Sequence, residues 1–352
     1  MNTAGELPLA RWWRPLDAGR IECRLCPRQC RLRDGQDGFC FVRGNRGGAM
    51  RLVAHGRSSG FGVDPIEKKP LAQFLPGTRV LSFGTAGCNL ACRFCQNWRI
   101  SRARAGALAG APVAPGWIAA AAVRQGCRSV AFTYNEPTVF AEQALEVAAA
   151  CHAAGVRTVA VTAGYIGAEA RAEFFAGMDA ANVDLKAFTE EFYRRQCGGR
   201  LGPVLETLAF LHRETPVWLE VTTLLIPGLN DSEAELGRAA EWFATHLGPD
   251  VPWHFSAFHP DYQLLDRPPT PVATLGRARR IAQAAGLRYV YIGNVRDPEG
   301  GRTHCPRCGR AVIERDGYRL TGWHLRAGRC AYCGSEVAGV FEEASAGVGG
   351  RG

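Results

Sequence analysis

Short apolar runs rich in β-branched residues alternate with amphipathic stretches along the middle of the chain. Between about residues 78 and 296 there are seven such runs, and each ends in polar or glycine residues. They span 79–85, 128–137, 157–165, 180–188, 216–227, 252–260 and 288–295. Strands that alternate with helices favour a parallel sheet. The pattern predicts an α/β fold, namely a full or partial (β/α) barrel, with a doubly wound open sheet as the alternative.

The rest of the chain divides into flanking parts. We expect an N-terminal cysteine-rich metal module and connection over 1–77, the barrel over 78–298 and a zinc-ribbon-like module over 299–336. The stretch 337–352 is rich in small residues and glycine, so we expect it to be disordered. Barrels carry their chemistry at the C-terminal ends of the strands, where the polar ends of these runs fall.

Composition predicts a cytoplasmic protein without membrane contact. The chain has 352 residues, of which 47% are hydrophobic and 21% charged, and its N-terminus lacks a signal-peptide core. The net charge of +9 comes from 42 Lys+Arg against 33 Asp+Glu. A basic balance raises the chance of an anionic substrate or a nucleic-acid partner. Because the charges form no concentrated stripe, a solvated surface is the favoured interpretation and nucleic acid is not expected.

Cysteine is the unusual residue, with fourteen in the chain. Eleven fall into local groups of four, three and four, which is typical of metal sites. The last group forms two C-x2-C pairs about twenty residues apart, and it predicts a closed structural zinc site. Its members are Cys305, Cys308, Cys330 and Cys333.

The first cysteine group also predicts a closed four-thiolate site. Its members are Cys23, Cys26, Cys30 and Cys40. Structural zinc and an auxiliary iron–sulfur cluster both remain open here, so the chain is expected to hold one or two zinc ions. Three cysteines lie outside the groups: Cys151 fits the apolar face of a helix, while Cys127 and Cys197 receive no role.

The middle group, Cys88, Cys92 and Cys95, has the spacing C-x3-C-x2-C directly after the first predicted barrel strand. Three thiolates can hold three irons of a 4Fe–4S cluster and leave the fourth iron open to a small molecule. The stretch GTAGCNLACRFCQNW resembles the cluster loop of radical S-adenosylmethionine (SAM) enzymes, in the branch similar to pyruvate formate-lyase-activating enzyme. The order of motifs from Cys23 to the third cysteine group resembles the radical SAM component of the AmmeMemoRadiSam system.

The resemblance implies a reaction and its partners. SAM chelates the open iron, and an electron from the reduced cluster cleaves it to methionine and a 5′-deoxyadenosyl radical that abstracts hydrogen. The implied partners are an electron donor of flavodoxin or ferredoxin type, and a protein substrate or other components of the AmmeMemoRadiSam system. Which substrate is used does not follow from the sequence.

The same resemblance assigns residues to SAM. Phe94 occupies the aromatic position between two cluster cysteines and is expected near the adenine. Family members commonly have Gly-Gly-Glu-Pro at the end of the second strand; this chain keeps Glu136 but has Tyr134 and Asn135 in place of the glycines. Asn135 and Glu136 are therefore cofactor-binding candidates, with Glu136 expected at the SAM amino group. A helix-capping role is the alternative for Glu136.

Alternation along two later runs places polar side chains on the inner face of the barrel. In AANVDLKAF, Asn182, Asp184 and Lys186 share one face. The resemblance places Asp184 and Lys186 near SAM, and a buried structural ion pair is the alternative. In WLEVTTLL, Glu220 and Thr222 point together, and we expect them to line the SAM ribose or the substrate.

Weaker candidates complete the expected site. Thr162 and Asn294 end strands and are assigned to cofactor binding, although Asn294 also suits a plain turn. His254 and His259 suit proton donation, but a structural role is favoured for each. Two rival functions remain: an RNA-modifying radical SAM enzyme, and a non-catalytic iron–sulfur or zinc electron-transfer protein.

Overall fold

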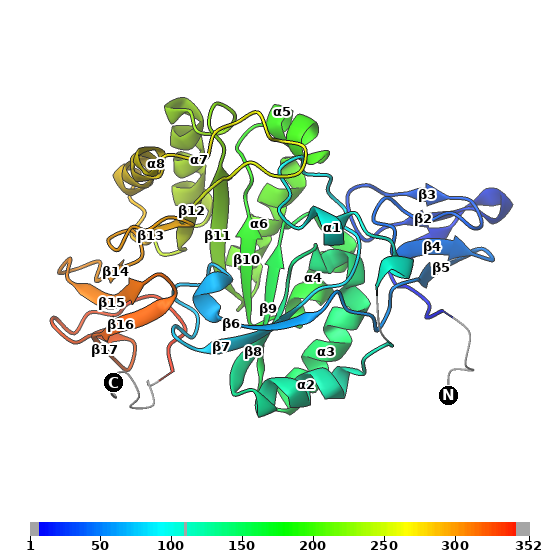
Figure 1. The fold of residues 1–352 in the computed structure, drawn as a ribbon, viewed down its shortest axis with the longest axis horizontal. Helices are drawn as coiled ribbons and strands as arrows, with labels where there is room; N and C mark the ends of the chain where they lie inside the picture. The colour runs from blue at the N-terminus through cyan, green and yellow to red at the C-terminus, as the bar shows by residue number, and fades with distance from the viewer. Residues whose placement is uncertain (1–6, 109–110, 343–352) are drawn as a thin grey trace.

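One eight-stranded sheet forms the centre of the computed structural model, which describes residues 7–108 and 111–342 (Figure 1). The strand order is β13-β12-β11-β10-β9-β8-β7-β6, with β7 to β13 parallel and β6 antiparallel to β7. The bounds are β6 Phe61–Pro65, β7 Arg79–Phe83, β8 Cys127–Phe132, β9 Arg157–Thr162, β10 Ala180–Asp184, β11 Trp218–Leu225, β12 Trp253–Ala257 and β13 Val290–Gly293. Since no pairing among the described residues joins β13 to β6, the sheet is a partial barrel.

The longer helices cover the outer face of this sheet: α2 Pro115–Arg124, α3 Ala141–Ala153, α4 Ala168–Ala176, α6 Gly202–Glu214, α7 Glu233–His246 and α8 Val272–Ala284. Two short helices, α1 Trp98–Ser101 and α5 Glu190–Phe192, lie in the loops after β7 and β10. Short 3-10 turns lie at Asp17–Gly19, Ile66–Lys68, Ala105–Ala107 and Pro137–Phe140, and a π-helical turn at Tyr193–Cys197. Ser232 caps α7 by accepting a bond from the Glu235 amide, as its sequence predicts. In the described part of the chain, no helix combines the length and apolarity that a membrane span needs.

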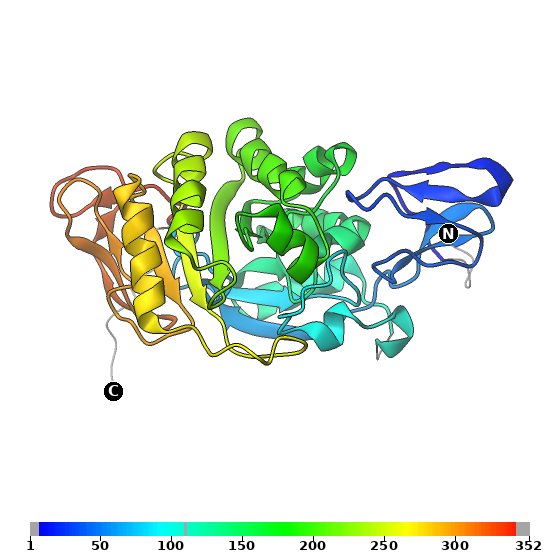
Figure 2. The same cartoon turned by 90° about the horizontal axis from the view of Figure 1, so that it is seen from above.

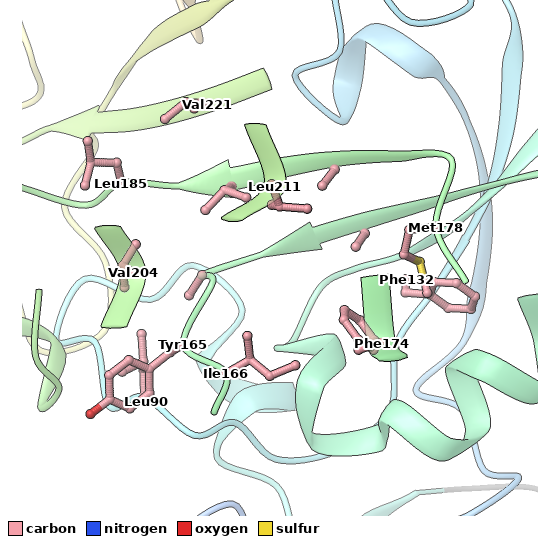
Figure 3. Close-up of a cluster of buried hydrophobic side chains, with 14 of the residues drawn as sticks. Leu90, Phe132, Tyr165, Ile166, Phe174, Met178, Leu185, Val204, Leu211 and Val221 are labelled. Atoms are coloured by element: carbon pink, nitrogen blue, oxygen red, sulfur yellow. The ribbon is translucent and has the colours of Figure 1, made fainter. Parts of the chain in front are cut away.

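The main core lies between the sheet and these helices. Figure 3 shows part of it, where Phe174 of α4 and Val204 and Leu211 of α6 pack toward the strands. All three side chains are completely buried. Burial of one such side chain stabilises the fold by about 1.5–3 kcal/mol. Helix packing therefore holds the strand ends, and the site built on them, in fixed positions.

The connection between β6 and β7 fills the bottom of the partial barrel. We call residues 66–77 the plug. Its Leu71 and Phe74 are buried against Val80, Val159 and other small apolar residues of the inner sheet face. The plug thus fills one end of the partial barrel with apolar side chains.

Two small modules flank the sheet, and Figure 2 shows them at opposite ends of the molecule. The N-terminal strands are β1 Trp13–Pro15, β2 Ile21–Cys23, β3 Arg31–Leu32, β4 Arg43–Arg46 and β5 Ala49–Leu52. The C-terminal strands are β14 Thr303–His304, β15 Ala311–Asp316, β16 Arg319–Trp323, β17 Leu325–Arg326 and β18 Arg329–Cys330.

The C-terminal module is fastened to the plug. Arg315 Nη2 donates to the carbonyl of Ala72 at 2.5 Å, and the Leu75 amide donates to the carbonyl of Val340 at 2.8 Å. Residues 337–342, expected to be disordered, instead dock on the plug, and 343–352 lie outside the described residues. The docking strand is too short to carry a periodic signal, which explains why the sequence pattern missed it.

Candidate active site

A cavity of about 960 Å³ opens at the C-terminal ends of the strands. It is lined by residues from β8 to β13, the plug, the C-terminal module and the loop after β7. All three cysteines of that loop, Cys88, Cys92 and Cys95, line the cavity. The structure therefore brings the three predicted ligands into one space with the polar strand ends.

Backbone contacts shape the three-cysteine loop. Gly87 has φ +80°, and a Cβ there would lie 1.9 Å from the carbonyl oxygen of Cys40, so only glycine fits. The amides of Ala91 and Arg93, on either side of Cys92, donate to the carbonyls of Cys197 and Gln196 at 2.8 Å each. The π-helical turn thus fixes the loop around its middle cysteine.

The thiols of this loop are protonated in the absence of a metal. Burial, together with the nearby Glu136 carboxylate, raises the pKa of Cys88. The adjacent Cys197 thiol and burial raise the pKa of Cys92 well above its usual value, and burial raises that of Cys95. A coordinated metal reverses this effect, because it deprotonates a thiol outright. Three thiols in one cavity are a donor set suited to an iron–sulfur cluster.

The side-chain amide of Asn135 is hydrogen-bonded to the backbone of the cluster loop, so it is not free to bind a ligand in the cavity. Its Oδ1 accepts from the Thr85 amide at 2.9 Å, and its Nδ2 donates to the carbonyls of Ala86 at 3.1 Å and Gly87 at 2.8 Å. The side chain lines the cavity, but its amide is already bonded on both sides. Its neighbour Tyr134, which stands where the resemblance places a glycine, adopts φ +71°, a conformation that favours glycine.

Glu136 links the ends of two strands. Its Oε1 accepts from the Thr138 amide and hydroxyl and from the Thr162 hydroxyl, the last at 2.6 Å, and its Oε2 accepts from the Ala163 amide at 2.7 Å. This is the capping contact that the sequence allowed, made together with a cavity position. Because Oε2 has a single donor, it keeps capacity for one further donor such as an ammonium group. Thr162 lines the same cavity with its hydroxyl bonded to Glu136.

Asp184 and Lys186 form an ion pair at the end of β10. Lys186 Nζ lies 2.9 Å from Asp184 Oδ2, and both residues line the cavity. Burial lowers the pKa of Lys186, but Asp184 and the thiols of Cys92 and Cys197 outweigh it and hold the pKa well above its usual value. The pair places a fixed positive charge beside the middle cluster cysteine.

Glu220 has a different role from the expected one. Its carboxylate accepts from the plug amides of Ala72 and Gln73 at 2.8 Å each, and it lies 2.6 Å from His254 Nε2. It is fully buried below the cavity, where it fastens the plug. Alternation gave its direction correctly, but the plug occupies the space it faces. Thr222, one pleat further along, does line the cavity, and its buried Oγ1 has no protein partner.

The remaining candidates are distributed around the cavity. Phe94 is buried and lines it, with its ring 5.8 Å from that of Phe192. Asn294 lines it and donates to the carbonyl of Ala257 at 3.4 Å, with φ +60° as a turn requires. His259 Nδ1 lies 3.2 Å from the side chain of Gln96 in the cluster loop. Sequence reasoning missed the C-terminal residues 315–318 in the wall, since no local signal links them to the barrel.

The C-terminal cysteine group is a second metal-binding candidate. The four sulfurs of Cys305, Cys308, Cys330 and Cys333 all lie within 4.8 Å of one another. Burial raises the pKa of Cys305, but hydrogen bonds from Ser335 and nearby backbone amides outweigh it and lower the pKa to about 6. Four closely spaced thiolates suit one tetrahedral ion and leave no open position for chemistry.

The N-terminal cysteine group lines a separate small cavity beside the cluster loop. Its four members, Cys23, Cys26, Cys30 and Cys40, come together there with the side chains of Arg43 and Asn89. Burial raises the pKa of Cys40 to about 11. The structure therefore gathers each of the three sequence groups into its own site.

A mostly parallel α/β sheet with a three-cysteine loop at its open end defines a class of SAM-dependent iron–sulfur enzymes, and the comparisons agree. The profile of the Radical SAM superfamily matches residues 83–239. The uncharacterized protein MJ0808 of Methanocaldococcus jannaschii is 39% identical over 330 residues, which cover 93% of this chain and 98% of the relative. The chain therefore contains a Radical SAM superfamily domain, and members of that superfamily use SAM with a 4Fe–4S cluster and require an electron donor.

The comparison with solved structures gives more distant matches. A radical SAM methyltransferase from Sphaerobacter thermophilus has a TM-score of 0.50 at 17% identity and covers 63% of this chain and 68% of its own. A domain of pyruvate-formate lyase-activating enzyme from Bacteroides vulgatus has a TM-score of 0.42 at 18% identity, covering 47% of this chain and 99% of the domain.

Proposed function

We propose that this chain reductively cleaves SAM at a 4Fe–4S cluster held by Cys88, Cys92 and Cys95. When bound, the cluster and SAM supply a 5′-deoxyadenosyl radical that abstracts hydrogen from a substrate in the cavity. The observation that carries the proposal is the meeting of three thiols, the Glu136 carboxylate and the Lys186 ammonium in one cavity of about 960 Å³. Thiols supply the iron ligands, and the charged groups complement the amino and carboxylate ends of SAM.

The chain's own residues would bind SAM, orient the cluster loop and shield the cavity from water. Asn135 and the π-helical turn hold the cluster loop on both sides of its ligands. Glu136 Oε2 would accept a hydrogen bond from the SAM amino group, and Phe94 would supply an apolar surface for the adenine. The loop after β12 adds cover, because the Gln263 amide donates to the carbonyl of Arg93 at 2.9 Å and Tyr262 stacks on Trp98. Excluding water protects a radical from quenching.

The finer part of the proposal concerns the substrate class. We place the chain in the AmmeMemoRadiSam system and propose a reaction similar to that of activating enzymes, with a protein substrate and a flavodoxin or ferredoxin as electron donor. The order of motifs along nearly the whole chain supports this assignment. We further propose zinc at the C-terminal cysteine group, because zinc is the commonest ion in closed sites of four thiolates.

The test is 5′-deoxyadenosine release by anaerobically reconstituted protein given SAM and a strong reductant. Cys92→Ala removes a ligand, whereas Cys151→Ala removes a thiol that is buried in α3 away from the cavity. Product from the wild type and from Cys151→Ala, but not from Cys92→Ala, supports the proposal. Equal product from the wild type and both variants would show that the three-cysteine loop does not carry the chemistry.

A further inference from the structure

The N-terminal cysteine group has the form of a closed metal site. Cys23 ends β2, Cys26 and Cys30 lie in the following turn, and Cys40 follows a second turn. The amide of Cys23 donates to the carbonyl of Cys30 at 2.9 Å, which closes the first turn. Three of the four residues are buried and the fourth is half-buried, and all four line one cavity. The site is thus preformed by the backbone.

The spacing of the sulfurs separates this group from the C-terminal one. Zinc–sulfur bonds of about 2.3 Å in a tetrahedron place the sulfurs about 3.8 Å apart. The C-terminal pairs Cys305–Cys333 and Cys308–Cys330 have sulfurs 3.6 Å and 3.7 Å apart. Across residues 7–108 and 111–342, only that group brings three or more such ligand atoms within 4.8 Å of one another. No three of the N-terminal sulfurs lie that close together. A wider spacing suits a polynuclear group rather than a single ion.

The cysteines of the cluster loop provide an internal comparison. Cys88, Cys92 and Cys95 are the ligands of the proposed SAM-cleaving cluster, and their three sulfurs also do not gather within 4.8 Å of one another. In a cubane each thiolate binds a different iron, so the sulfurs must stand farther apart than around one ion. The N-terminal group therefore shares the wide spacing of the iron–sulfur site and differs from the group with zinc-like spacing.

Arg43 gives the small cavity a buried donor for an anionic ligand. Its Nη1 pairs with the Glu142 carboxylate at 2.7 Å, and its Nη2 donates to the carbonyl of Arg11 at 2.6 Å. The side chain lines the cavity, only 1% of the residue is exposed, and its Nε is buried without a protein partner. Buried donors are rarely left unpaired. A cluster held by four thiolates is anionic, and its sulfur atoms accept such bonds.

We propose that Cys23, Cys26, Cys30 and Cys40 hold a second 4Fe–4S cluster, with all four irons coordinated and Arg43 Nε donating to it. The position of this second cluster relative to the first follows from the loop between them. Asn89 lines the small cavity, while the adjacent residues Cys88 and Leu90 line the larger one. The two clusters therefore lie on opposite sides of one loop. This inference does not depend on SAM cleavage, because the N-terminal ligands are separate from those of the cluster loop.

Metal content of a chain without the cluster-loop ligands tests the proposal. The variant Cys88→Ala/Cys92→Ala/Cys95→Ala is prepared and reconstituted anaerobically, and its iron, sulfide and zinc are measured together with its electron paramagnetic resonance after reduction. We expect about four irons and four sulfides per chain, and a signal from a reduced cluster. Zinc in the N-terminal site, or no metal in it, would overturn the proposal.

Two further measurements guard against misfolding of that variant. The wild-type chain should contain about eight irons, against about four if the N-terminal site holds no cluster. In the triple-variant background, Cys26→Ala should lose the remaining iron, whereas the matched control Cys127→Ala, a buried thiol outside the groups, should keep it. Iron that survives Cys26→Ala in full would refute the assignment, whether or not the wild type cleaves SAM.

Discussion

Replacing Asn135 by alanine tests whether this side chain serves the cluster loop or SAM. The substitution removes three hydrogen bonds of 2.8–3.1 Å to residues 85–87 and leaves their polar groups buried. At about 1 kcal/mol for each bond, the folded loop loses about 3 kcal/mol, which corresponds to a factor of about 100 in its equilibrium. We expect Asn135→Ala to lose its cluster to an iron chelator about 100-fold faster than the wild type.

The assay compares iron release with the KM for SAM in protein that still holds a full cluster. The matched control is Asn294→Ala, which removes an amide from another strand end and breaks a single bond of 3.4 Å. That variant should release iron at the wild-type rate. If Asn135→Ala kept its cluster normally and only raised the KM for SAM, the side chain would be a SAM contact and the argument from the loop would be refuted.

Three other substitutions test separate parts of the structure. Gly87→Ala should abolish cluster retention, because its Cβ would meet the carbonyl oxygen of Cys40. Gly106→Ala, which has open space around it, should retain the cluster normally. Equal iron content in these two variants would contradict the expectation. Cys308→Ala should remove one metal ion per chain and lower SAM cleavage by disordering the cavity wall formed by 315–318; full activity without that ion would contradict it. Asp179 is half-buried, and this partial burial raises its pKa, but bonds from a backbone amide, an arginine and a histidine outweigh burial and lower the pKa. The carboxylate therefore stabilises the fold above the ordinary pKa of 3.8, and this stabilisation is lost as pH falls through the lowered pKa. In urea unfolding, Asp179→Asn should lower the free energy of unfolding by about 2 kcal/mol at pH 7 and leave it unchanged in strong acid. A loss that stays constant with pH would contradict this.

The sequence predicted the α/β class and the parallel sheet because periodicity is a local property. Each of the seven apolar runs contains one parallel strand, β7 to β13. Alternation also gave the correct inner face for Asn182 and Glu220. It could not identify what they meet: Asn182 Nδ2 donates to the carbonyl of Pro70 at 2.7 Å, and Glu220 accepts from the next plug residues. A partner more than a hundred positions away leaves no periodic signal.

The same limit explains the missed thiol contact. Cys197 had no neighbouring cysteine in the sequence, yet it is fully buried against Cys92 and raises that thiol's pKa. The contact depends on the π-helical turn, whose carbonyls receive the amides of the cluster loop. Spacing within one segment predicted the ligands, whereas the residues that position that segment come from other strands and turns.

The open edge of the barrel explains why the two ends of the chain matter to one cavity. No described strand joins β6 to β13, so the plug and the C-terminal module must complete that wall. Arg315 joins the plug to the C-terminal module. It donates to the carbonyl of Ala72, and its Nε lies 3.6 Å from Glu67 Oε1. Both Arg315 and Glu67 line the cavity. A metal in the C-terminal cysteine group would therefore act on the cavity by ordering the strands that carry Arg315, without touching the cluster or SAM. The N-terminal module lies against the other side of the three-cysteine loop, so each flanking cysteine group supports a different wall of the same cavity.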